Sequence, residues 1–155
     1  MTVTAKTLGI CAVLAGALAA GMPATAATTL RIGTVLAPND PMGQGLEKFK
    51  LDVEKATNGD VIIEVFHNSQ LGDTTEMIDQ ARAGAGIGTV TDVARLSSFV
   101  PSLAIMSAPF LFDTYEQADK FALSDEYISW GEELREKSGL VMIASNWYQG
   151  ARHAL

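Results

Sequence analysis

The stretch Val61–Phe66, which reads VIIEVF, decides the fold class of this chain. Four of its six residues are β-branched and the last is aromatic, a composition that favours a β-strand. Apolar residues recur at helical spacing before it, over residues 42–57, and after it, over residues 74–83. A short strand between two amphipathic helices predicts an α/β domain with a mainly parallel sheet and flanking helices.

The helix before this strand has the clearest pattern. Its apolar stripe consists of Leu46, Phe49, Val53 and Ala56. Asn58-Gly59 follows, a pair typical of a helix C-cap. This stripe predicts that one face of the helix packs on the sheet.

Further elements follow outward from this centre. We expect strands over residues 30–36, 87–91, 103–108 and 140–144, and a short helix over residues 92–99. Asp113 with Glu116 three residues on resembles a capping box. Ser124 is expected to cap a last helix, which ends at Gly139 and carries Tyr127, Trp130 and Leu134 on one face.

The first 26 residues have the pattern of a cleavable secretory signal peptide. Lys6 precedes an apolar run over residues 8–22, which is shorter than the roughly 20 residues of a membrane-spanning helix. Ala24-Thr25-Ala26 fits a small-x-small cleavage site, so we expect cleavage after Ala26, with Ala27 as the alternative. An N-terminal core helix is the competing interpretation. With cleavage after Ala26, the mature domain would span residues 27–155, in the periplasm and without membrane insertion.

Charge and cysteine content narrow the function further. After the signal segment the chain has 10 basic and 18 acidic residues, a net charge of −8. This balance argues against non-specific binding to nucleic acid or to anionic lipid. The single cysteine, Cys11, lies inside the signal segment, so we expect no disulfide and no cysteine-based metal site in the mature chain.

Catalytic and cofactor motifs find little support. The glycines of residues 84–88 follow a helix and precede a strand, the reverse of a nucleotide-binding loop, and indicate a helix stop and a turn. Neither His67 nor His153 has a spacing typical of a metal site, and no serine lies in a nucleophile elbow. We therefore expect no enzyme activity and no cofactor.

A parallel sheet binds ligands at the carboxyl ends of its strands, which directs attention to three loops, residues 37–41, 91–95 and 146–152. Arg95 begins the helix after the third strand, where a guanidinium can grip a carboxylate in a bidentate manner, and Asp92 can hold it. A solvated surface arginine is equally compatible with this position. Trp147 and Arg152 lie in the last of these loops, where packing is the alternative for the tryptophan.

Three motifs carry a family resemblance. Asn68-Ser69-Gln70-Leu71-Gly72-Asp73 with the helix after it, Pro109-Phe110-Leu111-Phe112, and Asn146-Trp147 through Gly150-Ala151-Arg152 occur in this order. Together they resemble the solute-binding subunit of tripartite ATP-independent periplasmic (TRAP) transporters, of the dicarboxylate-binding type. The first motif is the most specific of the three.

The resemblance implies a two-lobed periplasmic protein that closes on a small organic acid and delivers it to a membrane permease. It implies that Arg152 contacts the ligand, that Arg95 and Asp92 lie on the ligand side, and that Asn39 lines the cleft. Gly88 departs from the polar residue usual there, and the family's Gly-x-Lys-x-Arg motif does not occur in the chain. We therefore expect an N-terminal part of the binding protein, without the second lobe.

Two other functions stay open at this point. A binding protein of another transporter type, for amino acids or inorganic anions, would share the export signal and the α/β pattern. A secreted α/β enzyme is the third possibility.

Overall fold

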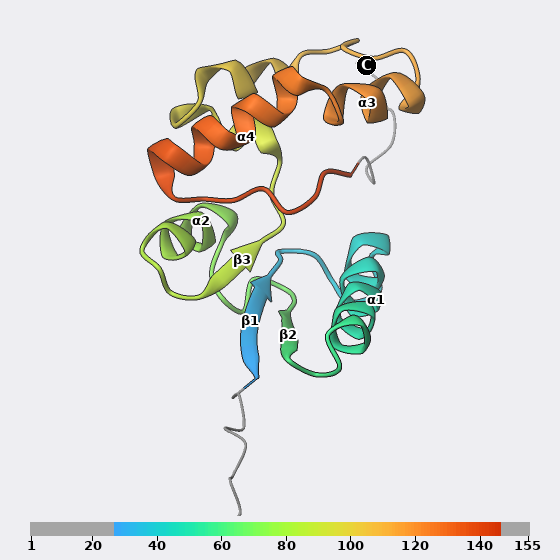
Figure 1. Cartoon of the computed structure of the whole chain (residues 1–155), viewed down its shortest axis with the longest axis vertical. Coiled ribbons are helices and arrows are strands. Elements are labelled where there is room, and N and C mark those ends of the chain that lie inside the picture. Colours follow the sequence, from blue (N-terminus) through green and yellow to red (C-terminus); the bar gives the residue numbers. More distant parts are fainter. Residues whose placement is uncertain (1–26, 147–155) are drawn as a thin grey trace, which may run out of the picture.

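The computed structural model describes residues 27–146. Its sheet has three parallel strands in the order β2-β1-β3, which are β2 (Val61–Phe66), β1 (Thr28–Gly33) and β3 (Ile87–Thr89) (Figure 1). Arg31 of β1 pairs with Glu64 on one side and with Ile87 on the other. Because the strands are parallel, their carboxyl ends meet at one edge of the sheet.

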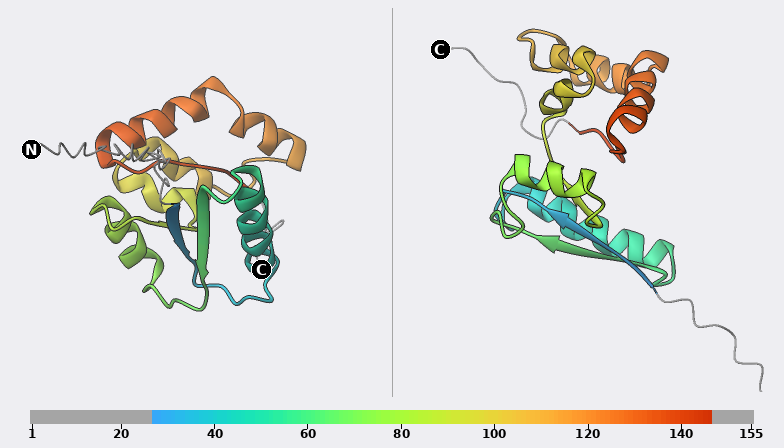
Figure 2. Two further views of the ribbon diagram at one scale, coloured as in Figure 1. Left: turned by 60° about the horizontal axis from the view of Figure 1, so that its bottom comes forward. Right: turned by 90° about the vertical axis from the view of Figure 1, so that its left-hand side faces the viewer.

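Two helices cover the two faces of this sheet, α1 (Pro41–Ala56) and α2 (Thr74–Arg82) (Figure 2). Side chains of a strand alternate between faces, and β1 shows the consequence directly. Ile32 packs into a cluster with Leu46 of α1, whereas the next residue, Gly33, faces the side chain of Met77 in α2. The α/β fold with a parallel sheet and flanking helices is confirmed.

A second group of helices lies beyond the carboxyl edge, as Figure 2 shows, and consists of the 3-10 helices η1 (Val93–Ser98) and η2 (Pro101–Ser107) and the helices α3 (Tyr115–Ala122) and α4 (Asp125–Ser138). Their core consists of Ile78, Leu96, Val100, Leu103 and Leu134. Because Ile78 belongs to α2, this core joins the second group to the sheet layer.

Two of the predicted strands are wrong. Residues 103–107 lie in η2, where Pro101 occupies the first turn, and Ala108 is its C-cap. Only Val100 and Leu103 of this region are fully buried. A spacing of three residues between buried side chains is that of a 3-10 helix. Of residues 92–99, which were expected to form an ordinary helix, Val93–Ser98 likewise form the 3-10 helix η1, with Asp92 and Phe99 as its caps.

The segment 140–144 also forms no strand in the part of the chain that the structure describes. Its side chains alternate as those of a strand do, since Leu140 and Met142 pack on the second core, whereas Val141 and Ile143 are 64% and 69% exposed. No neighbouring segment pairs with its backbone among residues 27–146. Alternation makes a segment extended, but only a partner strand makes it part of a sheet.

The ends of the helices follow the sequence signals in most places. Ser124 accepts a hydrogen bond from the Tyr127 amide, and Gly139 ends α4 in the left-handed conformation with φ 75°. Gly84 and Gly86 have φ of 78° and 66°, so the glycine cluster is the expected turn.

The capping box, by contrast, lies elsewhere than predicted. Asp73 accepts from the Glu76 amide, and the Glu76 carboxylate accepts from the Asp73 amide, so α2 has the complete box. At α3 the cap is Thr114, and Asp113 instead donates its amide to Gln117.

The pKa of Glu116 is lowered by a hydrogen bond from its own amide and by one from the side chain of Thr114.

No helix among the described residues has the length and apolarity that crossing a bilayer requires.

Candidate functional site

The carboxyl edge of the sheet brings together the starts of three loops. They follow Gly33 of β1, Phe66 of β2 and Thr89 of β3. The first leads into α1, the second into α2 and the third into η1. Two of the three loops singled out from the sequence, residues 37–41 and 91–95, therefore lie at this edge.

Asn39 lies exposed in the first of these loops. Its carbonyl oxygen accepts a hydrogen bond from Gln44 Nε2 at 3.1 Å, and the next residue, Asp40, caps α1 by accepting from the Met42 amide at 2.9 Å. The helix therefore holds the backbone around Asn39, while the side chain stays open to solvent. The placement agrees with a residue that can meet a ligand, and its role remains a prediction.

Asp92 and Arg95 lie together after β3. The Arg95 Nε and Asp92 Oδ2 atoms are 3.8 Å apart, and both side chains are more than half exposed. Asp92 precedes η1 but its side chain accepts no capping hydrogen bond, so its carboxylate is directed to Arg95 instead. An exposed ion pair of this kind contributes little to stability. It leaves the guanidinium, in η1 beyond the carboxyl edge of the sheet, exposed to solvent, where an anion can reach it.

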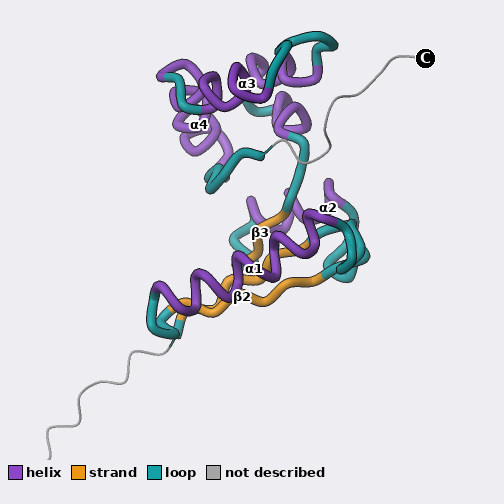
Figure 3. The backbone as a smooth tube through the Cα atoms, turned by 90° about the vertical axis from the view of Figure 1, so that its right-hand side faces the viewer, coloured by secondary structure: helices purple, strands orange, loops and turns teal. Residues whose placement is uncertain are grey.

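Trp147 and Arg152, and the cleavage residue Ala26, lie outside the described residues. The structure shows only the approach to the third loop. Ala144 and Asn146 line a shallow apolar pocket with the first turns of α1, including Pro41 and Met42. Ser145 shares a 2.9 Å hydrogen bond with the hydroxyl of Tyr127 in α4. The segment leading to Trp147 thus passes between α4 and the start of α1 (Figure 3).

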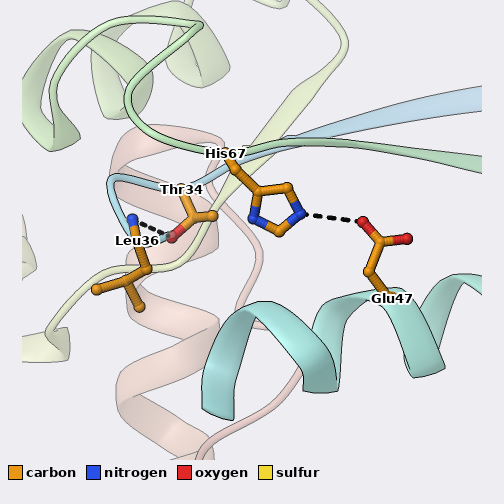
Figure 4. A network of polar contacts seen from close by, with 4 residues as sticks. All are labelled: Thr34, Leu36, Glu47 and His67. Carbon is orange, nitrogen blue, oxygen red and sulfur yellow. Dashed lines mark hydrogen bonds and ion pairs between the residues drawn. The ribbon is translucent and has the colours of Figure 1, made fainter. Parts of the chain in front are cut away.

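Three residues of this edge were not predicted as a group. His67 directly follows β2 and is buried, and its Nε2 lies 3.0 Å from Glu47 Oε1 on α1 (Figure 4). Thr34 directly follows β1 and is 1% exposed. The sequence left a surface or a structural position open for His67, and the structure shows it buried. Its partner is 20 residues away, and no short-range pattern connects the two.

Metal binding finds no support in the described part of the chain. Within residues 27–146, no three histidine, cysteine, aspartate or glutamate side chains gather as ligands of a metal ion would. The exposed polar side chains described above are the amide of Asn39, the guanidinium of Arg95 and the carboxylate of Asp92. The amide and the guanidinium can donate hydrogen bonds to an anion.

Comparisons with known proteins agree with this arrangement. The family model DctP, described as bacterial extracellular solute-binding protein, family 7, matches residues 32–154. The C4-dicarboxylate-binding periplasmic protein DctP of Rhodobacter capsulatus is 33% identical over 105 residues, which are 66% of this chain and 32% of that protein. The chain spans about a third or less of the length of the first curated relatives it matches.

Solved structures give the same family. A TRAP periplasmic solute-binding protein from Escherichia fergusonii, in an apo open form, is 46% identical with a TM-score of 0.74, over 80% of this chain and 41% of that one. Another from Ochrobacterium anthropi, with bound L-fuconate, is 28% identical with a TM-score of 0.70, over 72% and 37%. Together with the family match and the parallel sheet, these findings show that this chain belongs to family 7 of the bacterial extracellular solute-binding proteins, the periplasmic binding proteins of TRAP transporters.

Proposed function

We propose that this chain takes part in binding a small organic acid in the periplasm, for delivery to the membrane permease of a TRAP transporter. The observation that carries the proposal is the exposed Arg95 guanidinium at the carboxyl edge of the sheet, held by Asp92 at 3.8 Å. With Asn39 exposed in the neighbouring loop, this edge offers charged and polar donors to an anion. Trp147 and Arg152 are proposed to complete the site.

The ligands of solved relatives support the acid class. Three relatives between 28% and 32% identical hold L-fuconate, L-galactonate and orotic acid. All three ligands carry a carboxylate, and the first two are sugar acids. A C4-dicarboxylate is the narrower alternative, which the name of the Rhodobacter capsulatus relative supports. The planar guanidinium of an arginine can bind a carboxylate with two parallel hydrogen bonds, which the ammonium group of a lysine cannot do.

Delivery to a permease and export by a signal peptide are the remaining parts of the proposal. Proteins of this family act in the periplasm, and the apolar N-terminal segment that ends at Ala26 or Ala27 would bring the chain there. No chemical conversion of the ligand is part of this function.

The test is calorimetric binding with the protein purified from the periplasm. The probes are L-fuconate, L-galactonate, orotate and succinate, with L-fucose as a neutral control that resembles L-fuconate but has no carboxylate. We expect binding of at least one acid and none of L-fucose. If L-fucose binds as tightly as L-fuconate, or if an acid is converted to another compound, the proposed function is wrong.

A further inference from the structure

His67 and Glu47 join two elements that are far apart in the sequence. The His67 side chain is only 10% exposed, whereas that of Glu47 is 48% exposed. The Nε2 atom of His67 lies 3.0 Å from Glu47 Oε1, and Figure 4 shows the His67 ring pointing from the end of β2 across to α1. Because a carboxylate only accepts, Nε2 donates to it in a charge-assisted hydrogen bond. The other ring nitrogen, Nδ1, is buried without a partner among the described residues.

The loops after β1 and β2 are tied together around this histidine. The Thr34 amide donates to the Phe66 carbonyl at 2.8 Å, and the Ser69 amide donates back to the Thr34 carbonyl at 3.1 Å. The Asn68 amide donates to the Leu36 carbonyl at 3.0 Å. The parallel pairing of the two strands thus continues beyond the sheet, into the loop that leads to Asn39.

The backbone at this tie is in an unfavourable conformation. Asn68 and Ser69 have φ of 52° and 59°, in the left-handed region that residues with a Cβ atom rarely adopt. Such conformations persist only where the surrounding contacts determine them. The two hydrogen bonds from these same residues to Leu36 and Thr34 are contacts of that kind.

The far end of the β1 loop is held by α1. Gln44 binds the Asn39 carbonyl, and Asp40 caps the helix. Gly43 packs directly on the backbone of Ala37 and Pro38. The loop of residues 34–40 is therefore fixed to β2 at its start and to α1 at its end, and the contact between His67 and Glu47 connects these two supports.

We propose that His67 and Glu47 are a positioning pair, which fixes the loop of residues 34–40 at the sheet's carboxyl edge in a ligand-ready conformation before any ligand is bound. This inference rests on the proposed function for its consequence, because the loop presents Asn39. The structural part of the inference, that the contact between His67 and Glu47 holds Asn68 and Ser69 against this loop, does not depend on the proposed function. Pre-ordering of a loop strengthens binding by lowering the entropy that is lost when the ligand arrives.

Four variants of the full chain test the pair. Glu47→Leu and His67→Leu remove the contact from either side. His67→Gln keeps an N–H donor three bonds from Cβ, as Nε2 of histidine is, and serves as the conservative variant. Glu54→Leu is the matched control, since Glu54 lies on the same helix and its side chain makes no hydrogen bond or ion pair within residues 27–146.

The decisive measurement is hydrogen exchange of single backbone amides by NMR. We expect both leucine variants to speed exchange of the Asn68 and Ser69 amides about tenfold or more relative to the Ile32 amide, the scale of one charged hydrogen bond. His67→Gln and Glu54→Leu are expected to stay near wild type. Because Glu47 is half exposed, Glu47→Leu folds and keeps the test valid even if the buried His67→Leu does not.

Affinity for L-fuconate, measured on the same variants, tests the consequence. We expect the affinity to fall about tenfold in Glu47→Leu and to stay near the wild-type value in His67→Gln. Unchanged exchange at Asn68 and Ser69 in Glu47→Leu would overturn the positioning pair, whatever the affinity. Faster exchange in a protein that binds no acid would leave the pair standing and count against the proposed function instead.

Discussion

Gly43 lies so close to the backbone of Ala37 that a Cβ atom placed on it would be 2.4 Å from the Ala37 carbonyl oxygen. A Cβ atom placed on Gly45, two residues further along α1, would have no atom within 4 Å. The two glycines therefore have different reasons to be in one helix. The first allows the β1 loop to rest on the helix, and the second has no packing reason in the structure.

Gly43→Ala is predicted to destabilise the protein although alanine is the better helix former. The methyl group would collide with backbone, which cannot rotate away, and overpacking of this kind costs about 1–3 kcal/mol. Gly45→Ala is the control and should raise the free energy of unfolding by about 0.5–1 kcal/mol, because its site is open. Urea unfolding of both variants measures the difference. Equal stabilisation by both would show that the loop does not press on the helix.

A second close approach lies on the opposite face of the sheet. A Cβ atom on Gly33 would be 2.3 Å from the Met77 sulfur, and Met77 is 0% exposed. Gly33→Ala should cost about 1–3 kcal/mol for this reason. Met77→Ala alone leaves a cavity and should cost about 2–5 kcal/mol. The double variant is expected to be more stable than the sum of both effects, since the new methyl group enters the space vacated by the methionine. Additive effects in thermal unfolding would contradict the contact.

The second helical group depends on Leu134. This residue of α4 is 0% exposed and packs with Leu103 and Val100. Leu134→Ala is expected to lower the free energy of unfolding by about 2–5 kcal/mol. Leu123→Ala is the matched control, because Leu123 is 79% exposed, and it should change stability by less than about 0.5 kcal/mol. Similar losses in both variants, measured by chemical denaturation, would argue against this core.

Arg152 and Arg95 are predicted to contribute unequally to ligand binding. Arg152→Lys keeps the charge but loses the bidentate fork, so affinity for the bound acid should fall by about 1–3 kcal/mol. Arg95→Ala should weaken binding less if the ligand is a small acid that does not reach it. Calorimetry on the protein with each substitution measures this. Equal affinity of the wild type and Arg152→Lys would assign Arg152 a structural role.

The export signal makes a prediction about mass. The intact protein recovered from the periplasm should begin at Ala27 or Thr28, because the small residues of Ala24-Thr25-Ala26 fit a signal peptidase site. Intact-mass spectrometry distinguishes these products by one alanine. Recovery of a periplasmic chain that retains Met1, in cells with active signal peptidase, would rule out the signal peptide.

The sequence by itself determined the elements whose signals are local. Val61–Phe66 is a strand with the predicted bounds, and α1 is displaced from its prediction by one residue. Ser124 caps the start of α4 and Gly139 ends it, as expected. These signals depend on β-branching, helical spacing and capping, all of which act within a few residues. The position of Asp92 and Arg95 after β3 could also be predicted, because the strand pattern indicated a parallel sheet, whose carboxyl ends lie at one edge.

Only the tertiary structure decided which extended segments pair and which polar groups meet. Residues 140–144 alternate as a strand does, but pairing requires a second backbone, which a local pattern cannot supply. Residues 103–107 form part of a 3-10 helix because Leu103 packs into a core whose other members lie in different elements. His67 likewise finds Glu47 only because the sheet places the end of β2 beside α1. Contacts between distant residues are set by the packing of whole elements, and that packing brings a buried histidine and a helix carboxylate to the same edge of the sheet.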